Sequence, residues 1–384
     1  MAHQVVVIGA GYAGVIAASR LAGSREGRRG ALAVTLVNPT ERFVERIRLH
    51  EYVAGSRGDA TIPLRELLHP GIRLVIAHAT EIDPRARTVS LSTGDDLPYD
   101  HLIYAVGSGA RSAPAAAHTV ADAAGAERLR RALDAARPGD HVAVVGGGLT
   151  AIETATEIAE SRPALQVELH AATLGPSLGE RGRAHVRATL DRLGVTLDEG
   201  VSVDPAELER LGADHVVWCA GLAVPALAAS SGLLTDADGR MLVTPTLHSL
   251  SDDRILGAGD AVRIDDTRYD YLRMACATAM PLGGHVADTV LRALRGRAPR
   301  PHSNGFAAQC VSLGRKDAVV QFVRLDDRPT RLVWRRGLGA WAKETICRFT
   351  VGAARSEARR SGSYIWLRRR FAQTAVTGQP VTTR

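Results

Sequence analysis

Short runs of β-branched residues alternate along the first half of the chain with Ala-rich segments whose apolar positions have helical spacing. Residues 5–8 (VVVI) predict a buried strand, residues 15–22 a helix, and residues 33–37 (AVTLV) a second buried strand. The same order returns between residues 141 and 169. Two strand–helix–strand units of this kind predict an α/β fold with two parallel sheets.

A Gly-rich turn, residues 9–14 (GAGYAG), joins the first predicted strand to the first predicted helix. Gly9 permits a tight turn, Gly11 lets backbone N–H groups approach a phosphate, and Gly14 lets the helix pack closely on the strand. The N-terminus of the helix adds a partial positive charge. The turn therefore predicts a site for the phosphates of a nucleotide.

A second copy of this turn lies in residues 141–160, between a Val-rich strand and a helix. Gly146, Gly148 and Ala151 repeat the spacing of the first turn. One Gly-rich turn after a strand has purely structural explanations, but two copies at this separation are much less expected by chance. We therefore predict two dinucleotide sites.

The residues at the ends of the second strands bear on which nucleotide each site binds. Asn38 stands where an acid would bond the adenosine ribose, and it is either a ribose acceptor or a turn-forming Asn before a proline. In the second unit the corresponding residues are His170-Ala171-Ala172, which provide no acid and no adjacent Arg. The choice between NADH and NADPH stays open.

A third Gly-rich turn lies in residues 254–262 (RILGAGDAV). It places Asp260 among backbone donors, either as a helix N-cap or as a partner for a hydroxylated cofactor chain. Residues 273–291 follow with small residues at helical spacing, which predicts a helix laid against a flat ligand.

The composition fits a cytoplasmic globular protein. The chain has 384 residues, 45% of them hydrophobic, enough for two or three domains. No apolar run reaches the roughly 20 residues that span a bilayer, and the start does not read as a signal peptide. The four cysteines are widely separated, which predicts mostly buried thiols in a reducing compartment and no zinc pair. We find no pattern for a metal or Ser-His-Asp site.

Positive charge is concentrated in the last quarter of the chain. The formal net charge is +7, yet from residue 291 onward 20 Lys/Arg stand against 5 Asp/Glu. The remainder of the chain is therefore acidic, and the basic part is a candidate binding surface.

The order GAGYAG, LIYAVGS, VVGGGLTAIE, VVWCAG and LGAGDA, spread over residues 5–297, resembles the pyridine nucleotide-dependent flavoproteins with two dinucleotide-binding domains. Within that family it resembles type II NADH dehydrogenases and apoptosis-inducing-factor-like oxidoreductases. The resemblance implies two Rossmann-like domains, one for FAD and one for NAD(P)H, plus a small α+β C-terminal region. The implied FAD residues are Gly9, Gly11, Gly14, Asn38, Ala105, Gly107, Asp260 and Met280. The implied NAD(P)H residues are Gly146, Gly148, Ala151, Glu153 and Gly221.

Two of the residues near the expected redox centre have alternative interpretations. Glu153 is either near the nicotinamide or an ordinary solvated helix residue. His50 is a weaker candidate, because only its position in a mixed basic and apolar segment supports it. The chemistry itself is assigned to the flavin, with no catalytic acid or base required.

Departures from the family concern the electron acceptor. Residues 38–55 contain no Cys, so electrons are not expected to leave through a protein disulfide there. Residues 276–283 (CATAMPLG) lack the paired Gln of type II dehydrogenases, which weakens the case for a quinone. Met280-Pro281 is then either an apolar platform by the flavin or helix-end packing.

The C-terminal part resembles the family least. Residues 305–323 predict two short strands around a turn, and residues 339–360 predict a helix with Ala342, Ile346, Phe349 and Ala353 on its apolar face. Arg368-Arg369-Arg370 follow, with Trp366 as a candidate interfacial anchor. The basic surface is a solvated flank, an attachment to anionic lipid on the inner membrane face, or a dock for an acidic electron-transfer protein. We expect no nucleic acid, and a homodimer is open.

These observations predict a division into residues 1–113 (FAD-binding), 114–240 (NAD(P)H-binding), 241–300 (FAD-binding, second part) and 301–384 (basic C-terminal region). The predicted function is transfer of electrons from NAD(P)H through FAD to a non-disulfide acceptor, such as a quinone. One alternative is a soluble reductase of a small organic substrate or a ferredoxin-like protein. Another is a slow-turnover flavoprotein with a binding or signalling role.

Overall fold

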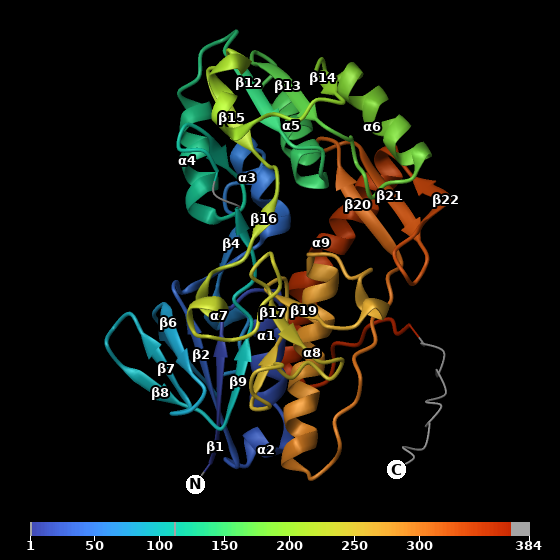
Figure 1. Ribbon diagram of the computed structural model, residues 1–384. Helices are drawn as coiled ribbons and strands as arrows, with labels where there is room; N and C mark the ends of the chain where they lie inside the picture. Colours follow the sequence, from blue (N-terminus) through green and yellow to red (C-terminus); the bar gives the residue numbers. More distant parts are fainter. Residues whose placement is uncertain (1, 111–112, 370–384) are drawn as a thin grey trace, which may run out of the picture.

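A parallel five-stranded sheet organises the lower half of the molecule (Figure 1). The computed structural model describes residues 2–110 and 113–369. The strand order is β18-β9-β1-β2-β5, with every pairing parallel. The strands are β1 (His3–Ile8), β2 (Leu32–Asn38), β5 (Ile72–Ile76), β9 (His101–Tyr104) and β18 (Ile255–Gly257). The three adjacent strands β18, β9 and β1 are buried over most of their length, so they form the centre of the larger core, whereas β5 is a partly exposed edge strand.

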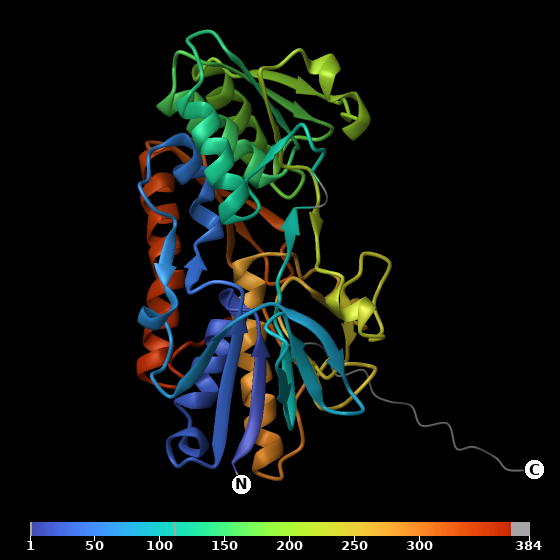
Figure 2. The same ribbon diagram turned by 90° about the vertical axis from the view of Figure 1, so that its left-hand side faces the viewer.

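Helices α1 (Tyr12–Ala22) and α8 (Cys276–Leu294) cover one face of this sheet, and a third long helix, α9 (Arg336–Arg359), packs on α1. Helix α1 lies against both of the others (Figure 2). The approach of α8 to α1 is very close, because a Cβ on Gly283 would lie 2.2 Å from the Ala13 carbonyl oxygen. Helix α1, near the start of the chain, is thus packed together with α8 and α9, which come near its end.

A second parallel sheet organises the upper half, with strand order β11-β15-β12-β13-β14. Its strands are β11 (His118–Thr119), β12 (His141–Val145), β13 (Gln166–Ala171), β14 (Thr196–Glu199) and β15 (His215–Trp218). The helices around it are α4 (Ala123–Asp134), α5 (Leu149–Ser161) and α6 (Glu180–Arg192). The two sheets confirm the predicted fold class of two Rossmann-like units.

Smaller elements connect and cover the two sheets. The short helices are α2 (Arg25–Arg28), α3 (Leu49–Ala54), α7 (Leu227–Ser230) and four 3-10 turns, Arg46–Arg48, Leu64–Glu66, Pro205–Leu211 and Thr267–Tyr269. The remaining small strands are β3 (Arg42–Val44), β4 (Thr61–Pro63), β6 (Ala79–Asp83), β7 (Thr88–Leu91), β8 (Asp96–Pro98), β10 (Gly109–Ala110), β16 (Leu222–Ala223), β17 (Met241–Val243) and β19 (Val262–Ile264). Helix α3 packs on α4 and α5. It therefore belongs to the core of the upper half.

The C-terminal region is an antiparallel sheet followed by a long helix. Strands β20 (Ala308–Ser312), β21 (Ala318–Val323) and β22 (Pro329–Trp334) form the sheet, and α9 begins directly after it. The two predicted strands and the predicted helix are confirmed, with the helix starting three residues earlier than expected. None of the helices within residues 2–110 and 113–369 is both long and apolar enough to cross a membrane.

The predicted apolar face of α9 is wrong in half of its members. Ala342 and Ala353 are buried, but Ile346 is 37% and Phe349 59% exposed. The face that packs inward lies to one side of the predicted one and carries Lys343, Cys347, Thr350, Ala354 and Glu357. Charged residues on the buried face concealed it from a search for apolar periodicity.

Trp366 is also placed differently from the prediction. Its indole N–H donates to the Ser303 carbonyl at 2.9 Å, and the Arg20 guanidinium lies 5.6 Å from the ring centroid. The side chain is thus folded against the protein and is not an exposed anchor. Arg370 lies outside the described residues.

Candidate functional site

The first Gly-rich turn forms an open cradle at the N-terminus of α1. Gly9 has φ +98°, and a Cβ there would lie 2.3 Å from the Ala105 carbonyl oxygen. A Cβ on Gly14 would lie 1.8 Å from the Gly9 carbonyl oxygen, so both positions require glycine. Gly11 is the N-cap residue of α1, and no side chain at this position accepts a hydrogen bond from the first N–H groups of the helix. No atom lies within 4 Å of the position that a Cβ on Gly11 would occupy. Open space before unsatisfied helix N–H groups fits a pyrophosphate.

Asn38 ties the end of β2 to this cradle. Its side-chain oxygen accepts from the Ala10 N–H at 2.9 Å, and its amide nitrogen donates to the Thr40 carbonyl at 2.8 Å. The side chain therefore organises the turn, and its oxygen keeps a second lone pair for a ribose hydroxyl. The ribose contact stays a prediction.

Asp260 lies at the carboxyl end of β18, facing the same cleft as β9. One carboxylate oxygen accepts from the Ser108 hydroxyl at 2.7 Å, and Arg46 donates to the Ser108 carbonyl at 2.8 Å. The other oxygen, Oδ1, is buried and has no hydrogen-bond partner. A buried acceptor without a donor is rare in proteins, so a hydroxyl-bearing ligand fits here. The N-cap interpretation of Asp260 is wrong, since β19 and no helix follows it.

A cavity of about 300 Å³ lies beside Asp260. Thr278, on the first turn of α8, lines it with a hydroxyl that is also buried and unpartnered. Met280, two residues further along α8, is 3% exposed and belongs to the core formed with α1. Two orphaned polar atoms at one cavity strengthen the fit to a cofactor with several hydroxyl groups.

The second cradle, at the N-terminus of α5, repeats the geometry of the first. Gly146 has φ +137°, and Gly148 is the uncapped N-cap of α5 with nothing within 4 Å of its Cβ position. Ala151 is fully buried. Gly147, which the motif spacing does not include, is the tightest position, because a Cβ there would lie 1.9 Å from the Thr173 carbonyl oxygen. In the sequence, the run of three glycines at 146–148 is the feature that could have indicated this tight position.

Two further glycines with positive φ follow central strands. Gly107, after β9, has φ +71°, and Gly221, after β15, has φ +77°. Around Gly107 the space within 4 Å of a Cβ is empty, whereas Ala105 is buried. Backbone without side chains thus borders the site at the carboxyl ends of both sheets, where ligands of open α/β sheets bind.

Glu153 lies between the two halves in a sealed group of charges. Its side chain is only 9% exposed, so the solvated interpretation is wrong. One carboxylate oxygen accepts from Lys343 Nζ at 2.8 Å and from the Ser312 N–H at 3.0 Å. The other lies 3.7 Å from His50 Nδ1. Its role beside a nicotinamide stays a prediction.

Glu153 and Lys343 stabilise each other's ionised forms. Burial alone would raise the pKa of Glu153, but Lys343 and His50 outweigh it, and the pKa is lowered. Burial lowers the pKa of His50, whose Nε2 is buried without a partner. For Lys343, burial opposes the charge, yet Cys310 and Glu153 raise its pKa. Lys343 was missed by the sequence search, because nothing near it in the chain indicates its partner.

The thiols are held in their protonated form. Cys347 is buried, the other three are half-buried, and among the described residues all four are free. Burial raises the pKa of Cys276 to about 11 and that of Cys219 and Cys347 to about 12. At neutral pH these groups are poor nucleophiles.

Comparisons with known proteins agree with this site. A family model described as pyridine nucleotide-disulphide oxidoreductase matches residues 3–280. An NADH dehydrogenase-like protein of Mycobacterium tuberculosis is 33% identical over 326 residues, which cover 76% of this chain and 80% of that protein. The sulfide:quinone oxidoreductase of Aquifex aeolicus has a TM-score of 0.76 at 19% identity, over 93% of this chain and 92% of that one. NDH2 of Plasmodium falciparum in complex with NADH has a TM-score of 0.73 at 13% identity, covering 94% and 98%.

The structural likenesses show the fold, while the family model covers both cradles and the Asp260 turn. The open helix N-termini and the orphaned acceptors provide places for two dinucleotides. The chain therefore belongs to the pyridine nucleotide-disulphide oxidoreductase family and is an oxidoreductase that uses FAD with NADH or NADPH.

Proposed function

We propose that the protein passes electrons from NAD(P)H through FAD to a quinone at a membrane surface. The observation that supports this acceptor is an apolar stripe on the outer side of α9. Leu338, Trp341 and Phe349 lie on it and are 53%, 63% and 59% exposed. Exposed large side chains in one group mark interaction surfaces, and these are available to a lipid bilayer or an apolar substrate.

Basic residues flank the stripe. Arg335 and Arg336 stand at the start of α9 and Arg348 beside Phe349, where its side chain is 77% exposed. In Figure 2, α9 runs along one edge of the molecule, so its outer side is open to a flat surface. An apolar stripe with basic flanks is typical of helices that lie in the interface of anionic membranes.

The residues of the cleft have distinct roles in this proposal. The redox chemistry between the nicotinamide and the acceptor would be supplied by FAD when it is bound. The N-termini of α1 and α5 hold the two pyrophosphates, and Asp260 holds the hydroxyl chain of FAD through its unpartnered oxygen. Glu153, fixed by Lys343, orients the nicotinamide end. Alignment by these residues supplies the entropic part of catalysis.

A protein disulfide is not a suitable acceptor. Residues 38–55 contain no cysteine, and burial holds the Cys276 thiol protonated at the start of α8. Electrons therefore go directly from the flavin to an external acceptor.

The acceptor is tested by comparing three oxidants under anaerobic stopped flow: a long-chain quinone in vesicles, a short water-soluble quinone and a ferredoxin. Trp341→Ser/Phe349→Ser removes the stripe, and Val201→Ser/Leu234→Ser is the matched control, because both of its residues are at least half exposed elsewhere.

We expect the stripe variant to reduce the long-chain quinone at least tenfold more slowly and the short quinone at the wild-type rate. The control should behave as wild type with both. Preference for ferredoxin would favour the soluble-reductase alternative. If NADH and NADPH both fail to bleach the flavin, a binding or signalling role is favoured.

A further inference from the structure

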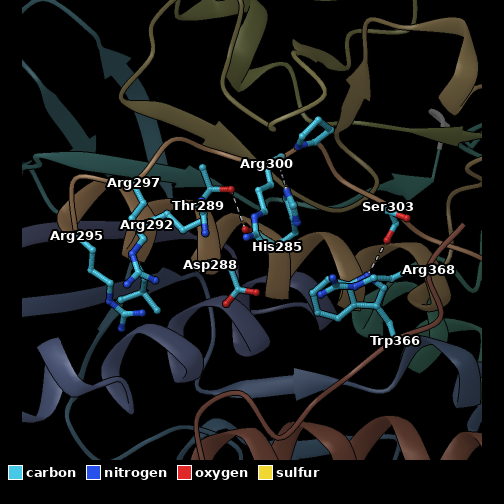
Figure 3. Close-up of a pocket in the computed structure, with 12 residues that line it drawn as sticks. His285, Asp288, Thr289, Arg292, Arg295, Arg297, Arg300, Ser303, Trp366 and Arg368 are labelled. Atoms are coloured by element: carbon cyan, nitrogen blue, oxygen red, sulfur yellow. Dashed lines mark hydrogen bonds between the residues drawn. The ribbon is translucent and has the colours of Figure 1, made fainter. Parts of the chain in front are cut away.

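A second cavity, far from both cradles, lies against the last turns of α8. It has a volume of about 240 Å³, and Figure 3 shows its lining side chains. Its wall contains the arginines Arg292, Arg295, Arg297, Arg300 and Arg368. Residues 276 and 292 are separated by about 24 Å along an α-helix, so this arginine pocket is distinct from the cofactor cleft at the other end of α8.

Three hydrogen bonds hold the walls of the arginine pocket in place. His285 Nε2 bonds the Arg300 carbonyl at 2.8 Å, and Arg292 Nε donates to the Ala298 carbonyl at 2.7 Å. These bonds fold the loop after α8 back along the helix. The Trp366 indole N–H donates to the Ser303 carbonyl at 2.9 Å and attaches the C-terminal segment as the far wall. The pocket is therefore formed without a ligand.

The charges of the arginine pocket are not balanced by acids. Asp288, the acid among its lining residues, is engaged by Arg20 at 3.2 Å. Arg295 pairs with Glu26 at 2.7 Å. The Asp288 carboxylate also interacts electrostatically with Arg368. Among the described residues, Arg297 and Arg300 form no ion pair with a carboxylate.

His285 does not relieve this charge. Burial lowers its pKa to about 4, helped by Arg368 and Arg20, so at neutral pH it is uncharged. In Figure 3, Arg292, Arg295 and Arg297 lie on one side of Asp288, with Arg368 and Trp366 on the other. A concave, preformed surface with excess positive charge attracts an anion of matching size.

The chemistry of the lining selects the class of anion. Guanidinium groups bind phosphate oxygens through two parallel N–H donors, which lysine cannot do. A cavity of about 240 Å³ has room for a small phosphorylated group. The Trp366 ring is already contacted by Arg20, Arg368, Tyr364 and His302, so it is not a platform for a base.

We propose that the arginine pocket binds a phosphate monoester or diester, either a free metabolite or the headgroup of an anionic lipid. The proposal does not depend on the identity of the electron acceptor. Arg297 and Arg300, which are exposed and carry no ion pair among the described residues, provide the main contacts.

The test compares the FAD-loaded protein with Arg297→Gln/Arg300→Gln. The control, Arg85→Gln/Arg128→Gln, removes the same charge from exposed positions outside the pocket. Calorimetric titrations use inorganic phosphate and glycerol 3-phosphate. Sedimentation uses phosphatidylcholine vesicles with and without phosphatidylglycerol. Arg297→Lys/Arg300→Lys keeps the charge and removes the planar donors.

We expect the pocket variant to weaken binding of the free phosphates, or of the phosphatidylglycerol vesicles, at least tenfold, with the control unchanged and the Lys variant intermediate. Loss with the free phosphates identifies a soluble ligand, and loss with vesicles alone identifies a headgroup. If the pocket variant and the control bind every probe equally, the proposal is wrong. Flavin content and the melting temperature verify folding of each variant.

Discussion

Removal of the Lys343 amine should destabilise the protein more than any surface charge does. Lys343 is 6% exposed and its Nζ lies 2.8 Å from Glu153. In Lys343→Met, the Glu153 carboxylate would stay buried with only the Ser312 N–H and the His50 ring near it. Breaking a buried ion pair on one side costs about 3–5 kcal/mol.

The loss should appear as a lower melting temperature of the FAD-loaded protein, by roughly 6–20 °C at about 2–4 °C per kcal/mol for domains of this size. The chain provides an internal control, since it has only two lysines and the other, Lys316, is exposed. Lys316→Met should change the melting temperature by little more than 1 °C. Lys343→Met/Glu153→Gln should recover most of the loss, because it removes the unpaired charge and keeps an acceptor for Ser312.

The pH dependence has a definite sign. In the wild type the pKa of Glu153 is lowered, so its stabilisation is present above the ordinary value of 4.5 and is lost as the pH falls through the folded pKa. In Lys343→Met, burial would instead raise that pKa, and protonation would relieve the unpaired charge. The stability gap between the two proteins should therefore narrow from pH 8 to pH 5. A loss below 1 kcal/mol that does not vary with pH would refute the reasoning.

Three further predictions concern the cofactor site. Gly9→Ala should destabilise the protein even without FAD, because its Cβ meets Ala105, whereas Gly11→Ala should keep the melting temperature and lose FAD affinity; equal stability of the two apoproteins would contradict this. Asp260→Asn should weaken FAD binding about tenfold, as expected for loss of a hydrogen bond to a charged group at about 1.5 kcal/mol; equilibrium dialysis that finds unchanged affinity would contradict the assigned partner. Cys276, with its pKa raised to about 11, should resist iodoacetamide at pH 8 until urea unfolds the protein, and mass spectrometry measures the labelled fraction.

The strand and turn pattern could be predicted because local physics decides it. Glycine is required at positions 9 and 14 by close contacts within the turn and with Ala105, which directly follows β9. Because only glycine fits these positions, the two glycines appear in the sequence at a recognisable spacing. The third Gly-rich turn could be recognised in the sequence, but the role of its Asp260 could not be decided there. Asp260 follows a Gly-rich turn as a helix cap would, and only the long path to α8 shows that it faces the cleft.

The buried charges could not be predicted from local sequence. Glu153 and Lys343 are 190 positions apart, and each reads alone as a solvated helix residue. The same holds for Glu357, which is fully buried because Arg20 holds it from the other end of the chain. Pairings of this kind depend on how distant segments pack, and they place the buried face of α9 to one side of the expected one.

Arg20 also sets an order of events during synthesis. It lies in the last turn of α1, at the opposite end from the first cradle, and its guanidinium contacts Glu357, Asp288 and the Tyr364 carbonyl. Glu357 and Tyr364 come 337 and 344 positions later in the chain. Until they are synthesised, α1 carries a charge on the face it must bury, without the carboxylate that pairs with it. A chain that ended before residue 357 would therefore leave the guanidinium of Arg20 without its buried partner.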